Sequence, residues 1–466
     1  MIASFTNQNR YLIFFVGLLG IRLAFNIVLP LMDQTEARYA EIARLMYETG
    51  NWVVLQIDYG EPFWAKPPLS TWAAASSLSL FGVSEFSIRL PYFLVCAGIA
   101  LGLGRYCNHS NPSYFLPACI LLTMPEFYLH AGVVSTDVFL LLSTVIVMLS
   151  FWESMQENAA PFWGYLFFLG MGLGVLAKGP IIGILTLPPI VFWSWKTKQF
   201  SKAIKRAPWF VGLLVFIFTC LPWYYLTEER SPGFIDYFIV GEHFNRYFNS
   251  EWKGDKYGFP KQQPLGIVWG FFLAFTLPWW IAALQWMRQH WRLLKTDPWV
   301  LFLLAWMLWP LLFFTASKSL IHPYILPSVV PLTLLLAYGW HQIKNIHWYL
   351  NIGLAVPLLL IGFYSTRTVD TVIKDNTDKY LIAEVNQHPC YSLNHKSYSS
   401  QFYTGGTVEK IDTQRLSTLR QAEQPFYILI RHKDTLRISS QMRNELTPVI
   451  ENKKKALYKY RKKGLD

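Results

Sequence analysis

Charged residues are scarce in this chain of 466 residues. Asp, Glu, Lys and Arg make up 15% of it, whereas a soluble globular protein has about 25%. Hydrophobic residues make up 53% and aromatic residues 17%. This deficit of charge excludes a chain folded around one water-soluble core, and the 20 Trp and 25 Tyr suit a protein with two membrane–water interfaces. The composition therefore predicts an integral membrane protein.

Paired cysteines and nucleotide-binding glycine motifs are also missing. The five cysteines show no CxxC spacing, which excludes a recognisable disulfide framework or structural zinc site. Neither a GxGxxG motif nor a Walker loop is found, so no nucleotide fold is expected. The formal net charge is +12, but residues 365–466 hold 18 basic against 11 acidic residues, and the remaining excess lies in short loops between apolar runs. That distribution follows the positive-inside rule and argues against nucleic acid as a partner.

Apolar segments of about 20 residues, the length of a transmembrane helix, recur along the first 364 residues. They predict eleven spans, at residues 11–31, 86–104, 113–130, 133–152, 162–176, 181–195, 209–226, 265–287, 299–316, 324–340 and 348–364. The first run lacks a small-residue cleavage signature, so we expect it to be retained as a span. An odd number of spans places the two termini on opposite sides of the membrane.

Basic residues in the short loops predict the orientation of the bundle. Residues 196–206 hold five basic residues and no acid, and residues 288–295 hold three more basic residues on the same side as the N-terminus. We therefore expect a cytoplasmic N-terminus and two long outward loops, at residues 32–85 and 227–264. The first loop should contain an amphipathic helix over 35–47, with Thr35 as a possible N-cap, lying on the membrane surface. Residues 1–364 would form the transmembrane domain.

Residues 365–466 are polar and predict a second, small domain on the outer side. A strand is expected at 425–431 (PFYILIR), and Gly405-Gly406 provides turn chemistry, which together indicate an α/β fold. For the basic run at 453–463 a solvated charged helix is favoured over contact with anionic head groups.

Ionisable side chains gather at the predicted outward face from six separated stretches of the chain. Such groups are costly near a membrane and mark functional sites. A carboxylate can accept a proton from an attacking hydroxyl, and Lys or Arg can neutralise a departing phosphate, so the set suits displacement at a sugar carbon. Lys178 and Lys318 could instead be snorkelling side chains at span ends. The candidate site residues are Asp33, Glu36, Arg38, Tyr39, Lys66, Asp137, Lys178, His243, Arg246 and Lys318.

Five motifs carry a family resemblance. Residues 32–91 (MDQTEARYAEIARLMYETGNWVVLQIDYGEPFWAKPPLSTWAAASSLSLFGVSEFSIRLP) closely resemble the first outer loop of the ArnT-like lipid A aminoarabinose transferases, a branch of the protein-O-mannosyltransferase superfamily. TDVFLL at 136–141, LAKGP at 176–180, GEHFNRYF at 241–248 and SKSLIHPYILP at 317–327 follow in the family's order. The resemblance implies a polytopic α-helical membrane protein of GT-C type, with about eleven transmembrane helices and a small C-terminal α/β periplasmic domain.

The function that the resemblance implies is that of an inverting glycosyltransferase in the bacterial inner membrane. It would move a sugar, expected to be an amino sugar, from an undecaprenyl-phosphate carrier to lipid A on the periplasmic face. Membrane lipids would be its other partners. A related enzyme acting on a protein or another polysaccharide remains open. A lipid-linked-sugar flippase is disfavoured, because a transporter should hold its charges near mid-membrane and often shows inverted repeats.

The resemblance assigns the catalytic carboxylate to the start of the first loop. The family pattern is an Asp-Glu pair directly before Arg-Tyr-Ala-Glu, whereas this chain has Thr35-Glu36 there and Asp33 two residues earlier. We predict Asp33 as the catalytic carboxylate and Glu36 as the second candidate, with Asp137 matching another family carboxylate. Against a lipid A phosphate, which is already ionised near neutral pH, Asp33 would orient the acceptor; against a hydroxyl it would act as the base.

The remaining candidates are expected to bind the substrates. Lys66 matches the lysine that contacts the carrier phosphate, and Arg246 and Lys318 fit as further phosphate contacts. Many relatives have a Glu directly before this lysine, which with a loop His looks able to bind a metal. This chain has Ala65 at that position, so we expect no metal at His243 and no other cofactor. Arg38, Tyr39, Lys178 and His243 complete the predicted binding residues.

Overall fold

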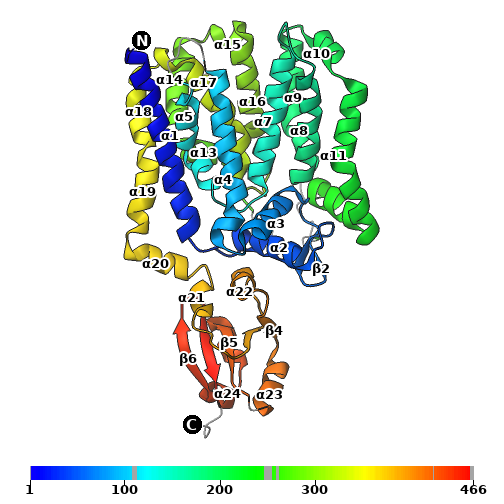
Figure 1. The fold of residues 1–466 in the computed structure, drawn as a ribbon, viewed down its shortest axis with the longest axis vertical. Coiled ribbons are helices and arrows are strands. Elements are labelled where there is room, and N and C mark those ends of the chain that lie inside the picture. The colour runs from blue at the N-terminus through cyan, green and yellow to red at the C-terminus, as the bar shows by residue number, and fades with distance from the viewer. Residues whose placement is uncertain are drawn as a thin grey trace.

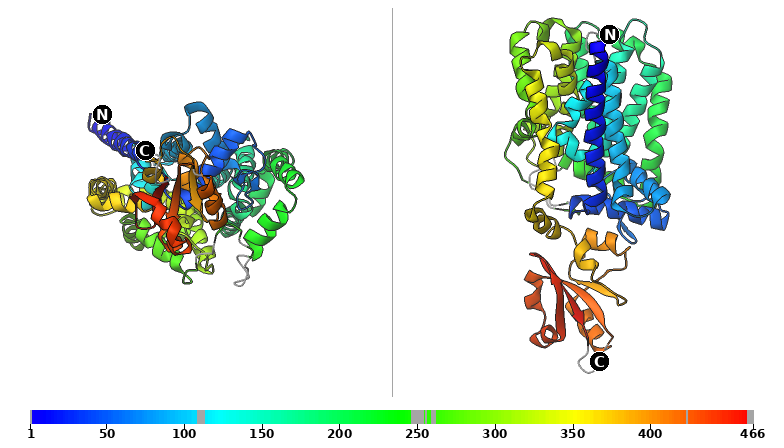
Figure 2. Two further views of the ribbon diagram at one scale, coloured as in Figure 1. Left: turned by 90° about the horizontal axis from the view of Figure 1, so that it is seen from below. Right: turned by 60° about the vertical axis from the view of Figure 1, so that its left-hand side comes forward.

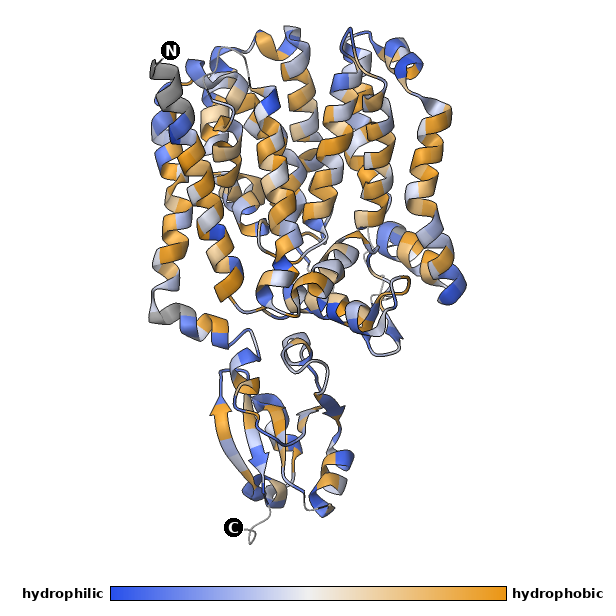
Figure 3. Cartoon of the chain, viewed as in Figure 1, coloured by the Kyte–Doolittle hydropathy of each residue, from blue (hydrophilic) through white to orange (hydrophobic). Residues whose placement is uncertain are grey.

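Apolar helices form most of the first 364 residues in the computed structural model, and a small sheet domain follows them (Figure 1). The structure describes residues 2–107, 113–245, 254, 256–258, 262–422 and 424–461. Hydrophobic residues predominate along the helices of the bundle, as a lipid environment requires, whereas the sheet domain has mixed polarity (Figure 3).

Within the described residues, six helical stretches are long and apolar enough to cross a membrane. They are Asn9–Val28 in α1 (Ile2–Val28), Glu85–Tyr106 in α4 (Glu85–Gly102) and η1 (Leu103–Tyr106), α7 (Asp137–Ser154), α11 (Trp209–Arg230), α16 (Pro298–Thr315), and Ile346–Tyr364 in α18 (Ile346–Gly353) and α19 (Ala355–Tyr364). The pair α13 (Ile267–Phe275) and α14 (Trp279–Gln289), bent by 98°, could add a seventh crossing. Shorter apolar helices are α8 (Phe162–Lys178), α9 (Ile181–Lys196) and η3 (His322–Ile325) with α17 (Leu326–Tyr338).

The eleven predicted segments therefore all coincide with helices, but the number of eleven crossings is not confirmed. Residues 113–130 show why. They form two short helices, α5 (Leu116–Leu122) and α6 (Pro125–His130), because Pro125 has no backbone N–H and begins a new helix. Every residue of α5 is buried, so this apolar run packs inside the bundle instead of facing lipid.

Close helix packing holds the bundle together. α7 lies against α8 and α9, and α8 also packs against α11. Gly172 of α8 makes the second contact possible, since a Cβ there would come within 2.7 Å of Thr219 on α11. Small residues at helix crossings are typical of membrane bundles, where close approach of backbones supplies the packing energy.

The two ends of the bundle differ in which parts of the chain they carry. α1 begins at the end that also carries the basic segments α10 (Phe200–Arg206) and α15 (Leu293–Thr296), and the sheet domain is attached to the opposite end (Figures 1 and 2). The two termini therefore lie at opposite ends of the molecule.

The first long loop folds over the end of the bundle that faces the sheet domain (Figure 1). It contains α2 (Thr35–Thr49), β1 (Gln56–Asp58), β2 (Glu61–Pro62) and α3 (Leu69–Phe81). The predicted helix over 35–47 is confirmed as α2, although Gln34, not Thr35, is its N-cap residue. α2 packs against α3 and against helix α22 (Tyr398–Tyr403) of the sheet domain, so it lies between protein layers and not only on a membrane surface.

The C-terminal domain contains a five-stranded mixed sheet with the strand order β4-β3-β5-β7-β6, which confirms the predicted small α/β fold. β3 is parallel to β4 and β5, and β7 is antiparallel to β5 and β6. The predicted strand at 425–431 is confirmed as β5, but residues 453–461, the described part of the terminal basic run, contain strand β7 and not a helix. The elements are α20 (Arg367–Lys374), α21 (Lys379–Ile382), β3 (Cys390–Leu393), α22, β4 (Glu409–Ile411), α23 (Thr413–Gln421), β5 (Phe426–Arg431), η5 (His432–Arg437), α24 (Ser440–Glu445), β6 (Leu446–Glu451) and β7 (Lys455–Tyr460).

Polar contacts join this domain to the membrane bundle. Lys379 Nζ lies 2.5 Å from a carboxylate oxygen of Glu85 at the start of α4. Lys396 Nζ lies 2.6 Å from Asp58 in β1. Each contact pairs a basic side chain of the sheet domain with an acidic side chain of the first loop or its end, so the domain is held against that loop.

Candidate active site

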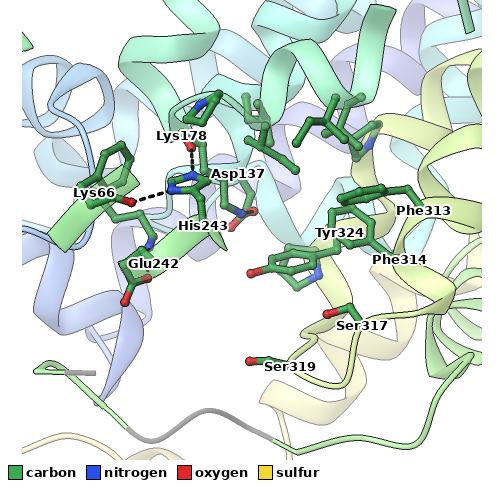
Figure 4. A pocket seen from close by; sticks show the side chains of 18 residues that line it. Lys66, Asp137, Lys178, Glu242, His243, Phe313, Phe314, Ser317, Ser319 and Tyr324 are labelled. Carbon is green, nitrogen blue, oxygen red and sulfur yellow. Dashed lines mark hydrogen bonds and ion pairs between the residues drawn. The ribbon is translucent and has the colours of Figure 1, made fainter. Parts of the chain in front are cut away.

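A cavity of about 250 Å³ opens where several bundle helices end near the first loop (Figure 4). Ionisable side chains line one part of it: Lys66, Asp137, Lys178, Glu242 and His243. Apolar side chains line another part: Leu140, Ile181, Ile184, Leu185, Phe238, Phe313 and Phe314. A cavity of this composition can accept an anionic head group together with an apolar chain.

Helix ends deliver the charged side chains to this cavity. Asp137 is the first residue of α7 and Lys178 is the last residue of α8, and the two helices pack side by side. An acidic group at a helix N-terminus and a basic group at a C-terminus are both favoured by the helix dipole. Lys66 comes from the turn before α3, and Glu242 and His243 come from helix η2 (Asp236–Asn245) in the second long loop.

Asp137 and Lys178 form a buried ion pair at the centre of the site. Lys178 Nζ lies 2.5 Å from Asp137 Oδ1, and the Lys178 and Asp137 side chains are 14% and 9% exposed. The ammonium group also lies 4.3 Å from the centre of the Tyr324 ring, a cation–π contact. Lys178 is therefore held in place from two sides.

Lys66 lies beside the second carboxylate of the cavity. Its ammonium donates a hydrogen bond to the carbonyl of Ala65 at 2.6 Å and is 3.7 Å from Glu242 Oε2. The Lys66 side chain is 20% exposed and Glu242 is 4% exposed, so the ammonium faces the cavity while the carboxylate is nearly enclosed. Each lysine of the cavity thus has one carboxylate neighbour.

His243 is fixed by backbone carbonyls. Its Nδ1 lies 2.7 Å from the carbonyl oxygen of Phe238, and its Nε2 lies 3.2 Å from that of Lys178 (Figure 4). Burial lowers the pKa of His243, and the neighbouring Lys66 lowers it further. Gly179 permits this approach: it has a φ of +80°, and a Cβ there would lie 3.0 Å from His243 Nε2.

The metal pair that the resemblance implies for relatives does not fit these residues. Ala65 presents a methyl group where relatives have a carboxylate, and both ring nitrogens of His243 face carbonyl oxygens. A metal needs several ligand atoms with available lone pairs, whereas Ala65 offers none and a neutral His243 ring offers a single one, on the nitrogen that does not donate to a carbonyl.

Four of the predicted site residues meet in the cavity: Lys66, Asp137, Lys178 and His243. Glu242 and Tyr324 also line it but are not in the predicted set. Glu242 is one of the ionisable residues of the predicted outward face, although no role was predicted for it, and both residues lie inside motifs that carry the family resemblance, GEHFNRYF and SKSLIHPYILP, a signal that could have identified Tyr324.

Asp33, the predicted catalytic carboxylate, does not line the cavity that contains Lys66 and Asp137. Its carboxylate accepts hydrogen bonds from the backbone N–H of Ser399, at 3.1 Å, and from the Ser399 hydroxyl. Burial raises the pKa of Asp33, and nearby Asp378 raises it further. The Asp33 side chain therefore binds the C-terminal domain through Ser399.

Glu36, the second predicted carboxylate, is also engaged outside the cavity. Its two oxygens each accept a hydrogen bond from the buried Arg89, both at 2.9 Å. This bidentate pair joins α2 to α4. Glu36 therefore stabilises the first loop, and its place at the acceptor is not supported by the geometry.

The other predicted binding residues surround the cavity or lie apart from its walls. Arg38 donates a hydrogen bond to the carbonyl of Tyr257 at 2.7 Å, and Tyr39 packs edge-on against Phe63. Lys318 is exposed and does not line the cavity, although the adjacent Ser317 and Ser319 do. Arg246 lies outside the described residues.

Comparison with known proteins identifies the fold and the relatives. Residues 9–238 match the family model of dolichyl-phosphate-mannose-protein mannosyltransferases. The structure superposes on the crystal structure of ArnT from Cupriavidus metallidurans bound to undecaprenyl phosphate with a TM-score of 0.76, at 17% identity, covering 97% of this chain and 98% of that one. The apo structure of the same protein gives a TM-score of 0.74. The predicted GT-C fold is thereby confirmed.

Curated relatives carry one common name, undecaprenyl phosphate-α-4-amino-4-deoxy-L-arabinose arabinosyl transferase. The protein from Enterobacter sp. (strain 638) is 29% identical over 344 residues, which cover 69% of this chain and 58% of that one. The protein from Aeromonas hydrophila is 30% identical over 317 residues, 66% of this chain and 56% of that one. This chain thus spans less than three-fifths of these relatives. Over residues 9–238 it is similar to the dolichyl-phosphate-mannose-protein mannosyltransferase family, and its overall fold is that of ArnT.

Proposed function

We propose that this protein transfers a sugar from an undecaprenyl-phosphate carrier to an acceptor at the outer face of a bacterial inner membrane. The observation that carries the proposal is the amphiphilic cavity, in which Lys66 and Lys178 lie beside an apolar wall that includes Ile184 and Phe314. A polyprenyl phosphate combines one anionic group with a long apolar chain. The lysines can bind the anionic group, and the apolar wall can contact the chain. The names of the curated relatives support the same donor class.

In this proposal the two lysines neutralise the carrier phosphate as it leaves. The bond between the sugar C1 and the phosphate oxygen breaks, a bond from C1 to the acceptor oxygen forms on the opposite face, and undecaprenyl phosphate departs with the electron pair. Charge that develops on the phosphate is stabilised by preorganised ammonium groups in a site with little water. Asp137 and Glu242 keep those ammonium groups in place.

The proposed acceptor is lipid A, and the proposed sugar is an amino sugar, as in the names of the relatives. A phosphate of lipid A is already ionised near neutral pH and needs no general base. That agrees with a cavity whose two carboxylates each face a lysine. The active site would face the periplasm and the N-terminus the cytoplasm, because the basic segments α10 and α15 lie at the end where α1 begins.

The proposal is tested with purified protein, undecaprenyl-phosphate-linked 4-amino-4-deoxy-L-arabinose and lipid A, with the product detected by mass spectrometry. Lys66→Met should lower transfer about 10- to 100-fold, because a hydrogen bond to a charged group contributes about 1.5–3 kcal/mol. Lys344→Met is the matched control, since Lys344 is exposed between η4 (Trp340–Gln342) and α18.

Three outcomes would contradict the proposal. Wild-type transfer by Lys66→Met would move the phosphate site elsewhere. Sugar transport across vesicles without a glycosylated product would favour a flippase. Transfer to a protein or a polysaccharide, with lipid A left unmodified, would keep the donor and refute the acceptor.

A further inference from the structure

Two histidines and a glutamate meet inside the bundle, outside the set of residues that the proposed transfer uses. Glu126 and His130 stand one helical turn apart on α6, and His322 begins η3. His130 Nδ1 lies 3.1 Å and His322 Nδ1 lies 2.9 Å from the same oxygen of Glu126, Oε1. The ligand atoms of the three residues all lie within 4.8 Å of one another.

Burial makes this cluster unusual. Glu126 is completely buried and His130 is 2% exposed, whereas the His322 side chain is 38% exposed. Moving a carboxylate out of water is costly unless a cation or strong hydrogen bonds compensate for the lost hydration. Among the described residues, the partners of the Glu126 carboxylate are two imidazole rings and not a lysine or an arginine.

We propose that Glu126, His130 and His322 form a binding site for a divalent transition metal, with zinc as the preferred ion. One carboxylate and two imidazoles match the ligand set of zinc sites that keep a fourth position for water or substrate. With metal–ligand distances of about 2.0–2.1 Å, tetrahedral ligand atoms lie about 3.3 Å apart. The separations of 2.9 and 3.1 Å need to open by a few tenths of an ångström, and His130 Nδ1, which also lies 2.9 Å from the backbone carbonyl oxygen of Glu126, would exchange that contact for the metal.

Neighbouring rings position the exposed ligand. The His322 ring stacks on Phe275 at a centroid distance of 5.1 Å and an interplanar angle of 16°, which fixes its plane. The pair Glu126 and His130 is fixed by α6 itself, because residues four apart share one helix face. Both sides of the site are therefore largely preorganised.

The metal would also hold one wall of the cavity. Residues 323 and 324 directly follow His322, and both line the cavity, with the Tyr324 ring over Lys178. An ion shared between α6 and η3 would fix this segment against the bundle. The site is distinct from the position of Ala65 and His243, and it does not depend on which sugar or acceptor is used.

The test is metal binding by full-length protein purified with a tag that lacks histidine and stripped with EDTA. After dialysis against zinc and elemental analysis, the wild type should retain about one zinc per chain. Glu126→Gln and His322→Ala should each bind at least tenfold more weakly. His341→Ala is the matched control, because His341 is exposed in η4, and it should bind like the wild type.

A second measurement separates metal loss from misfolding. Zinc should raise the thermal unfolding temperature of the wild type and of His341→Ala, since a ligand that binds the folded state stabilises it. It should leave that of His322→Ala unchanged, although this variant unfolds cooperatively. Less than about one-tenth of a zinc per wild-type chain, or equal zinc in all four proteins, would overturn the proposal. Neither zinc content nor unfolding temperature depends on sugar transfer. The metal proposal can therefore be judged even if the transferase assay fails.

Discussion

Breaking the ion pair between Asp137 and Lys178 should destabilise the fold strongly from either side. The pair is short and both side chains are at most 14% exposed, so removing one partner leaves the other as an uncompensated buried charge. Removing one partner of a buried pair costs about 3–5 kcal/mol. We therefore expect Asp137→Asn and Lys178→Met each to lose about 3–5 kcal/mol of unfolding free energy.

The double variant, which combines Asp137→Asn with Lys178→Met, distinguishes this explanation from simple loss of packing. It buries no charge at these two positions, and the methionine side chain can keep part of the contact with the Tyr324 ring. Its cost should fall below that of either single change, in agreement with the near neutrality of replacing a whole buried pair by uncharged groups. Transfer should stay low in all three variants, because each lacks either Lys178 or the carboxylate that positions it.

The assay is equilibrium unfolding in mixed micelles with increasing SDS, followed by Trp fluorescence. Lys344→Met serves as the control for loss of a lysine and should unfold like the wild type. Strict additivity, with the double variant as destabilised as the two single changes combined, would refute the view that charge compensation determines the stability of this site.

Two further predictions concern groups at the edge of the site. Asp33→Ala and Ser399→Ala should each speed proteolytic release of the C-terminal domain, and the double change should add little, because both remove one contact. Limited proteolysis measures this, and additive effects would argue against a shared contact. The folded pKa of His243 lies below its ordinary value of 6.5, so the stability contributed by its neutral ring is present above pH 6.5 and is lost as the pH falls towards the folded pKa. Unfolding between pH 5 and 8 should show this loss in the wild type and not in His243→Gln.

Local sequence predicts the helices of this protein well because apolar runs are a local property. Local sequence predicts less well whether one apolar run forms one continuous helix. Residues 113–130 are apolar throughout much of their length, yet Pro125 separates α5 from α6, and the burial of α5 depends on neighbouring helices that hydropathy does not describe. The number of crossings cannot be obtained from such runs alone.

The candidate site shows the same limit: residues at helix ends could be predicted from nearby sequence, whereas a contact with a distant domain could not. Asp137 and Lys178 could be predicted because each stands at one end of an apolar run, where helix packing brings such ends together. Asp33 occupies a similar place in the sequence, but its partner Ser399 is 366 residues away in another domain. No pattern near Asp33 reveals that partner, and the family motif, which differs here at Thr35, pointed to catalysis instead.

The contacts between the first loop and the C-terminal domain join parts of the chain that are synthesised far apart in time. Asp33 leaves the ribosome 366 residues before Ser399, and at about 5–20 residues per second this corresponds to roughly 20–70 s of synthesis. During that interval Asp33, Asp58 and Glu85 lack the groups that bind them in the finished protein. The loop that supplies Lys66 therefore gains these contacts only after most of the chain has been synthesised, and a nascent chain halted before residue 399 lacks the contact between Ser399 and Asp33.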